Sequence, residues 1–254
     1  MSDAPKAPVG PRQKLPEIDV FEHGATRGDV KQSMDARLFM QLLVFTSPVG
    51  EDPQRYVDAL VKGLEEAGAG AVVYADANDP RGIGLLTWSQ DPEHFVTTVR
   101  PLFARELLRD LTLRPEMTML GRTYSVGYEQ NLAHWILERP IENVTNGELG
   151  WHVWYPLRRI GAFERLDAQE QRAILGEHAL LGRAYGAQGL AHDVRLACHG
   201  LDANDNEFVI GLLGAKLHPL SHVVQTMRKT KQTSEYISQM GPFFVGRVVH
   251  ASKG

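Results

Sequence analysis

The residues best suited to chemistry lie together in the second half of the chain. Tyr155 is followed closely by Arg158 and Arg159, and His178 comes later, in a segment with helical periodicity. An imidazole can bind a metal ion, and a planar guanidinium group can bind a carboxylate through two hydrogen bonds. The Tyr155 phenol can relay one electron. This combination predicts a site for a metal-containing macrocycle with carboxylate side arms, of the haem type.

The segment around His178 strengthens this interpretation. Ile174, His178, Gly182 and Tyr185 recur at helical spacing and therefore share one face of a helix. Glycine inside a helix costs about 1 kcal/mol relative to alanine, and the missing side chain at Gly182 leaves room for a flat ring. Each residue alone has a simpler explanation. A single helical histidine often only packs or faces solvent, helix packing also uses glycine, and Tyr-Pro can end a strand because proline donates no ladder hydrogen bond.

Composition limits the class of protein. The chain has 254 residues, of which 43% are hydrophobic and 23% charged, as is typical of globular proteins with one large or two medium domains. The net charge of −4 gives no signature of nucleic-acid or anionic-membrane binding. The single cysteine, Cys198, excludes an internal disulfide. No apolar run is long enough to span a bilayer, and the N-terminus lacks a secretory signal, so we predict a cytoplasmic protein.

The pattern along the chain predicts an arm followed by two similar units. Residues 1–35 are rich in proline, glycine and charge and predict an extended N-terminal arm. Residues 36–145 predict a first unit of order βαββαβ, with a strand at 38–46, a helix at 53–67, strands at 71–74 and 83–88, a helix at 92–111 and a strand at 117–128.

Residues 146–254 predict a second unit of the same order. Its elements are a strand at 150–155, a helix at 167–185 with Asp167 as N-cap, strands at 192–199 and 207–213, a helix at 219–239 and a strand at 242–249. The predicted fold class is therefore α+β, with duplicated ferredoxin-like units that form a dimeric α+β barrel within one chain, linked near residues 139–148. The halves show no evident sequence similarity, so the duplication rests on element order. Only the second half carries the Tyr–Arg–His set, and we expect the site there.

Several motifs of the second half resemble the chlorite dismutase superfamily, and most closely its coproheme decarboxylase branch. They occur in the family's order and comprise Tyr155-Pro156 followed by basic residues, Glu177-His178 continuing as ALLGRAY, His199-Gly200-Leu201-Asp202, Met227-Arg228, Ser234, and Gly241-Pro242-Phe243-Phe244-Val245-Gly246. The first half resembles the family mainly in element order.

The resemblance implies roles for individual residues. His178 matches the family's proximal haem ligand, and Tyr155 matches the tyrosine that becomes a radical in the decarboxylases. Arg159, and with it Arg158, match basic residues that hold propionates, and Ser234 matches a serine near a propionate. Family members form ring-shaped homo-oligomers, usually pentamers, which we expect here as well.

The other side of the ring departs from the family pattern. The family's distal strand carries arginine in chlorite dismutases and glutamine in many decarboxylases. The corresponding residue is Asp193 when counted back from the Gly200 turn, and Ala191 when counted forward from the iron ligand. A distal histidine that some decarboxylases carry before the Tyr-Pro strand is also missing, because that region contains Glu138-Arg139-Pro140.

Asp193 and Arg195 are the local candidates for a group that handles peroxide, since alternate residues of a strand face the same way. In the alternative, Asp193 points into solvent and His192 or Ala191 faces the ring, because a slip of one residue exchanges the two faces of a strand.

Taken together, the residues and the resemblance predict an oxidoreductase. The expected reaction is peroxide-dependent oxidative decarboxylation of iron-coproporphyrin III to haem b, in which a Tyr155 radical takes a hydrogen atom from a propionate that then loses carbon dioxide. The alternatives are a haem b peroxidase or chlorite-degrading enzyme of the same superfamily, and a haem carrier or sensor without activity. Asp193 with Arg195 favours a peroxidase, whereas a carrier would need no Tyr155.

Overall fold

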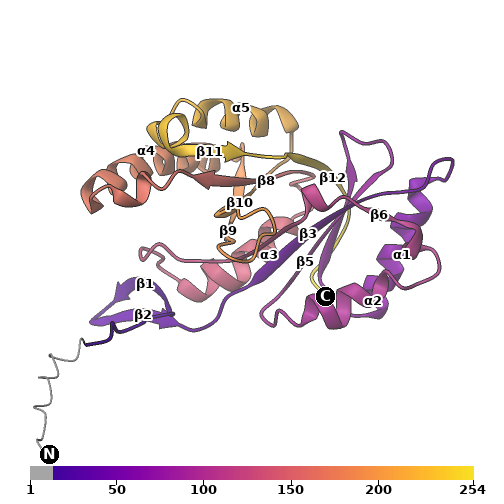
Figure 1. Cartoon of the computed structure of the whole chain (residues 1–254), viewed down its shortest axis with the longest axis horizontal. Helices are drawn as coiled ribbons and strands as arrows, with labels where there is room; N and C mark the ends of the chain where they lie inside the picture. The colour runs from indigo at the N-terminus through magenta and orange to yellow at the C-terminus, as the bar shows by residue number, and fades with distance from the viewer. Residues whose placement is uncertain (1–13) are drawn as a thin grey trace, which may run out of the picture.

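The computed structural model describes residues 14–254, so residues 1–13 of the predicted arm lie outside the described residues. Within the arm, β1 (Glu22–Arg27) and β2 (Val30–Met34) form an antiparallel hairpin, which projects beyond the rest of the molecule in Figure 1. Glu22 ties this hairpin to the body, because its carboxylate accepts hydrogen bonds from Arg122 Nη1 at 3.0 Å and from the Ser125 backbone N–H at 2.9 Å.

The first unit has the predicted order but two irregular elements. The predicted helix at 92–111 is confirmed only for residues 95–102, where a π-helical turn (Phe95–Val99) runs directly into α2, and a separate 3₁₀ turn (Leu108–Asp110) follows after a break. Pro101 within α2 lacks the backbone N–H of a regular helix. The strand predicted at 117–128 shortens to four residues. The elements are β3 (Phe39–Thr46), α1 (Pro53–Glu66), β4 (Ala71–Asp76), β5 (Gly82–Ser89), α2 (Arg100–Leu102), β6 (Thr112–Leu113) and β7 (Met119–Arg122).

The predicted link between the units is itself helical, and the second unit follows it. A π-helical segment (His134–Glu138) leads directly into α3 (Arg139–Val144). The helix predicted at 219–239 is interrupted after Met227, resumes as a π-helical turn (Gln232–Tyr236), and is wrong at residues 237–239, which belong to a strand. The elements are β8 (Trp151–Arg159), α4 (Ala168–Ala187), β9 (His192–Ala197), β10 (Phe208–Gly214), α5 (Leu217–Met227), β11 (Ile237–Met240) and β12 (Phe244–Ser252).

Local capping explains where α4 begins. The Asp167 carboxylate accepts hydrogen bonds from the backbone N–H groups of Gln169 at 2.8 Å and Glu170 at 2.9 Å. These are donors that the first turn of a helix leaves without an intrahelical partner. The predicted N-cap is confirmed.

Strand β8 runs past Pro156, where the sequence predicted an end. Strand β12 pairs with β8 only up to Trp154, and β11 pairs with it from Leu157 onward. Pro156 therefore lies where one neighbour replaces the other, so its missing N–H interrupts no ladder. Its carbonyl accepts a hydrogen bond from Gly241 N–H at 2.9 Å.

The strands close into an antiparallel barrel that confirms the predicted fold class. Among the described residues, the sheet runs β10–β9–β7–β3–β5–β4–β12–β8, and β8 pairs again with β10. One buried cluster, which includes Met40, Trp154, Val194 and Phe244, draws from strands of both units and fills the barrel. Helices α4 and α5 lie together beside β8, while α1 and α2 lie at the opposite end of the molecule (Figure 1).

Two equivalent hairpin loops carry a trace of duplication that the sequence analysis missed. The β4–β5 loop contains Asp76-Ala77-Asn78-Asp79, and the β9–β10 loop contains Asp202-Ala203-Asn204-Asp205. In both, the first aspartate accepts a hydrogen bond from the backbone N–H two residues on, at 2.9 Å and 2.7 Å. The tetrapeptides thus match in sequence and in the turn formed by their first aspartate, whereas Asp205 has a φ of 57° and Asp79 has no positive φ. Within residues 14–254, no helix has both the length and the apolar character needed to cross a membrane.

Candidate functional site

The register of three neighbouring strands brings three of the predicted site residues to one surface. Tyr155 of β8 lies directly opposite Ile210 of β10, and Ile210 lies opposite Arg195 of β9. Asp193 lies two residues before Arg195 and therefore points to the same side. We call this surface, which carries Tyr155, Asp193 and Arg195, the helical face. Leu212, which pairs with Asp193, packs there in one cluster with residues of α5.

Helix α4 carries His178 but packs little of its own surface. Of its twenty residues only Ile174 is buried. His178 is half-buried, and its Nδ1 is shielded from solvent without a hydrogen-bond partner in the described part of the chain. Burial and the nearby Arg195 guanidinium lower the pKa of His178, against the opposing effect of Asp193. The imidazole is therefore neutral at neutral pH, which is the form that binds metals.

Gly182, one turn after His178, lies where α4 faces α5 and could accept a Cβ atom without a clash. A Cβ atom added there would meet only the Met227 Cε atom, at 3.7 Å. One turn away, the Tyr185 hydroxyl forms hydrogen bonds with His222 Nδ1 at 2.7 Å and Thr226 Oγ1 at 2.9 Å. Helix α4 is thus attached to α5 near its C-terminal end.

Tyr155 is held rigidly on the helical face. Its ring is 6% exposed and stacks on Phe243, with centroids 4.6 Å apart and an interplanar angle of 24°. Burial raises the pKa of Tyr155 above its usual value, although the Arg228 guanidinium acts in the opposite direction. The phenol is therefore protonated at neutral pH. Arg228, to which the sequence analysis gave no role, is a cation in the surroundings of this phenol.

The two adjacent arginines are not brought together. Arg159 lies on the helical face and forms ion pairs with Glu164 at 3.0 Å and Glu207 at 3.1 Å. Arg158 points to the other side of β8, where its Nη2 atom donates a hydrogen bond to the Asn204 carbonyl. Two carboxylates already balance the charge of Arg159, so a third carboxylate would compete with them.

Ser234 lies on a short π-helical turn after α5 and is exposed. Its hydroxyl donates to the Thr230 carbonyl at 2.9 Å, which leaves the oxygen lone pairs available and its position fixed. The structure gives it no contact with the other predicted site residues.

Asp193 is clamped between two arginines, one of which sequence reasoning missed. Its Oδ1 accepts a hydrogen bond from Arg139 Nη2 at 2.7 Å, and its Oδ2 lies 2.9 Å from Arg195 Nε. Burial opposes ionisation, but the guanidinium groups of Arg195 and Arg139 hold the pKa of Asp193 below its usual range. The Trp135 ring faces both guanidinium groups: its centroid lies 4.4 Å from the Arg139 Cζ atom and 5.5 Å from the Arg195 Cζ atom.

A small cavity of about 20 Å³ lies beside this clamp, lined by Tyr124, Trp135, Arg139 and Arg195 among others. Such a volume accommodates one water molecule or an occupant of similar size. The sequence signal for Arg139 was the four-residue spacing that places it one turn after Trp135 on the linking helix, but nothing local connects this helix with β9.

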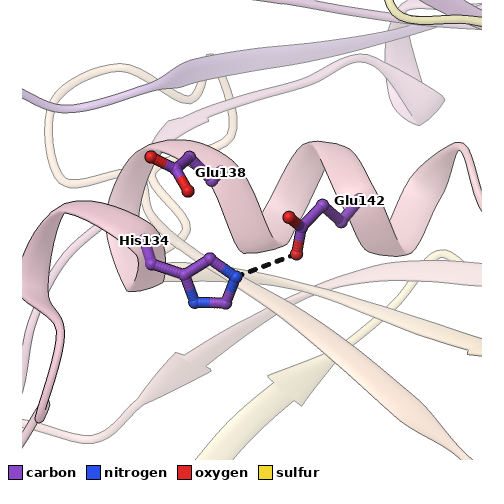
Figure 2. Close-up of side chains that lie close together, drawn as sticks. All are labelled: His134, Glu138 and Glu142. Atoms are coloured by element: carbon purple, nitrogen blue, oxygen red, sulfur yellow. Dashed lines mark hydrogen bonds and ion pairs between the residues drawn. The ribbon is translucent and has the colours of Figure 1, made fainter.

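The same helix carries a second group of polar side chains. Figure 2 shows His134, Glu138 and Glu142 along one side of the helix, and their ligand atoms lie within 4.8 Å of one another. His134 Nε2 and Glu142 Oε2 are 2.9 Å apart. Both glutamates are exposed, and a surface hydrogen bond between His134 and Glu142 accounts for the closeness of this pair. The linking helix therefore presents one face to solvent and the other to β9.

Known proteins resemble this chain in sequence and in fold. The family model for chlorite dismutase matches residues 81–249. A solved structure assigned as a chlorite dismutase has a TM-score of 0.68 at 15% identity, covering 84% of this chain and 95% of its own. A haem-binding protein from Thermus thermophilus has a TM-score of 0.64 at 19% identity, with 85% and 92% covered.

A mutant chlorite dismutase from Candidatus Nitrospira defluvii gives a TM-score of 0.66 at 13% identity, with 85% of this chain and 93% of that chain covered. At such identities these structures establish the shared fold alone. No curated protein sequence matches the chain significantly. The family match spans more than half of the chain, and the chain belongs to the chlorite dismutase family.

Proposed function

We propose that the chain binds an iron porphyrin against α4, with His178 as the iron ligand, and catalyses peroxide-dependent decarboxylation of iron-coproporphyrin III to haem b. The observation that carries this proposal is the His178 imidazole, which is neutral and has one nitrogen without a hydrogen-bond partner in the described chain. It lies near Asp193 and Arg195, on the face that also holds Tyr155. Family membership supports it, as does the haem-binding relative from Thermus thermophilus.

The residues present fit such a group. His178 offers the ligating form of imidazole, and Gly182, one turn along the helix, adds no side chain beside it. Bound iron would supply the redox chemistry by activating peroxide, while the protein supplies placement and electrostatics.

Tyr155 is the proposed radical relay. Its buried, protonated phenol would give up one electron and one proton, and the resulting phenoxyl would take a hydrogen atom from a propionate side arm. This transfer restores the phenol. The substrate then loses a second electron and carbon dioxide to leave a vinyl group, and one peroxide accepts the two electrons of each round. Stacking on Phe243 fixes the ring during both transfers.

The acidic side arms need cationic partners. We assign propionate contacts to Arg159, Arg228 and Ser234. Arg159 would exchange the exposed Glu164 carboxylate for a substrate carboxylate, whereas Arg158 points away from the helical face and is the weaker candidate.

Asp193 and Arg195 are the proposed groups for peroxide. Arg195 would donate hydrogen bonds to the oxidant, and the ionised Asp193 would hold Arg195 in place for this role. This pair also favours the second candidate function, a haem b peroxidase. A carrier or sensor of haem would have no use for the ordered Tyr155. We further propose a cytoplasmic homopentamer, which sedimentation analysis would test.

The deciding experiment loads the protein with ferric coproporphyrin III, adds peroxide and determines the porphyrin mass. We expect two successive losses of a carboxyl group in the wild type, and none in Tyr155→Phe despite normal porphyrin binding. Peroxide consumption with an unchanged porphyrin mass would replace the decarboxylase by the peroxidase. A porphyrin complex that neither consumes peroxide nor changes in mass would instead indicate a haem carrier or sensor.

A further inference from the structure

We infer that Arg139 is a positioning residue, which reaches from the linking helix to β9, holds Asp193 and thereby fixes Arg195 on the helical face. The contact between Arg139 and Asp193 is independent of any ligand. Its consequence for ligand binding rests on the proposed function.

The linking helix holds Asp193 of β9 through three hydrogen bonds. Arg139 Nη2 binds the Asp193 carboxylate at 2.7 Å, and Arg139 Nη1 binds the Asp193 carbonyl oxygen at 3.2 Å. Asn143 Nδ2 donates to the same carbonyl at 3.2 Å. Both the backbone and the side chain at this position are therefore fixed from outside the strand.

The contact between Arg139 and Asp193 lies at the edge of β9 that faces β7. Within residues 14–254, β9 pairs with β7 only through Arg122 and Ala197, at the far end of β9 from Asp193. On that edge of the described sheet, Asp193 has no strand neighbour, and an unpaired edge carbonyl needs a donor. Arg139 and Asn143 supply donors there. The linking helix thus covers the junction between the two units at the position of Asp193 and Arg195.

Two guanidinium groups share one carboxylate, and the Trp135 ring faces both. Arg195 uses its Nε atom for Asp193, and its Nη atoms make no hydrogen bond within the described chain. Because Arg139 occupies Oδ1, Asp193 is kept from turning to take a second N–H group of Arg195 in a bidentate pair. Arg139 therefore leaves the outer N–H groups of Arg195 available to a ligand.

A double-mutant cycle on the haem-free protein tests the contact itself. Urea unfolding is measured for the wild type, Arg139→Met, Asp193→Asn and the double variant. We expect the two substitutions to be non-additive by roughly tenfold in the unfolding equilibrium constant, as for other charged residues in contact. Asn143→Ala is the matched control, because it removes only a bond to the carbonyl and should add to Asp193→Asn. Additive effects of Arg139→Met and Asp193→Asn would overturn the inference.

Azide binding to the ferric haem-loaded protein tests the consequence. We expect Arg139→Met to weaken azide by roughly tenfold, since hydrogen-bond donors near a bound anion must be held in place to be effective. Arg139→Lys, which keeps one donor for Asp193, should recover part of the loss. In the Asp193→Asn background, Arg139→Met should change azide affinity little.

An equal loss of affinity in both backgrounds would contradict the inference, because Arg139 would then act through its own charge and not through Asp193. If the chain takes up no haem at all, the proposed function fails. The unfolding cycle still decides whether Arg139 positions Asp193.

Discussion

A buried histidine inside the barrel should make the protein sensitive to acid. His152 is fully buried and sits in a chain of hydrogen bonds. Trp154 Nε1 donates to the Tyr74 hydroxyl at 3.3 Å, the hydroxyl is 2.8 Å from His152 Nδ1, and His152 Nε2 is 2.9 Å from the Leu149 carbonyl. One neutral tautomer satisfies every group: Nε2–H donates to Leu149, and Nδ1 accepts from Tyr74.

A second proton on His152 Nδ1 would force the Tyr74 hydroxyl to accept where it now donates, and the hydroxyl hydrogen would lose its acceptor. Burial accordingly lowers the pKa of His152 from 6.5 to about 3, with a small opposing effect of the Leu149 hydrogen bond. Below pH 6.5 the unfolded chain therefore takes up a proton that the folded chain refuses. Each pH unit below 6.5 therefore lowers the free energy of unfolding by about 1.4 kcal/mol. His152 alone should remove about 2 kcal/mol of stability between pH 6.5 and about pH 5.

The assay is urea unfolding of the wild type and His152→Gln between neutral pH and about pH 5. Glutamine cannot take up this proton, so the variant should be less stable at neutral pH but lose less stability on acidification. The difference between the two curves isolates His152 from the other titrating groups. Tyr74→Phe is the control: it removes a hydrogen bond, costs about 1–3 kcal/mol by leaving buried groups unpaired, and keeps the wild-type pH slope. Equal pH slopes in the wild type and His152→Gln would refute the reasoning.

Three further predictions concern single side chains. Tyr155→Phe should bind coproporphyrin with unchanged affinity and consume peroxide, yet form no haem b; loss of binding in a titration would instead assign the phenol a structural role. Asp193→Asn should slow the reaction of the ferric complex with peroxide in stopped-flow mixing, and equal rates across pH would make Asp193 a bystander. Asp167→Ala should destabilise the protein by about 1 kcal/mol because α4 loses its N-cap, and an unchanged urea midpoint would show that this end of α4 contributes nothing to global stability.

Local sequence signals predicted most of the fold. The alternation of apolar residues located the barrel strands, and the Asp167 side chain marked the start of α4. The misplaced boundaries have specific causes. Pro101 and the π-helical turns interrupt segments whose apolar pattern reads as one helix, and β8 continues past Pro156 because two different strands pair with it on that edge.

The candidate site was predictable only in part. Arg158 and Arg159 lie beyond the strand predicted at 150–155, and their opposite orientations follow only because β8 continues to Arg159. The grouping of Tyr155 with Arg195 depends on the register of β8, β10 and β9, which no local pattern fixes. Arg139 reaches Asp193 across 54 positions of sequence, and such a contact exists only once the barrel has closed.

The iron–ligand bond tests the central claim most directly. Resonance Raman spectra of the ferrous haem-loaded wild type should contain an iron–histidine stretching band. The same band should be lost in His178→Ala and an equivalent band restored when imidazole is added to the variant. A band that persists in His178→Ala without added imidazole would contradict the account, because another residue would then hold the iron.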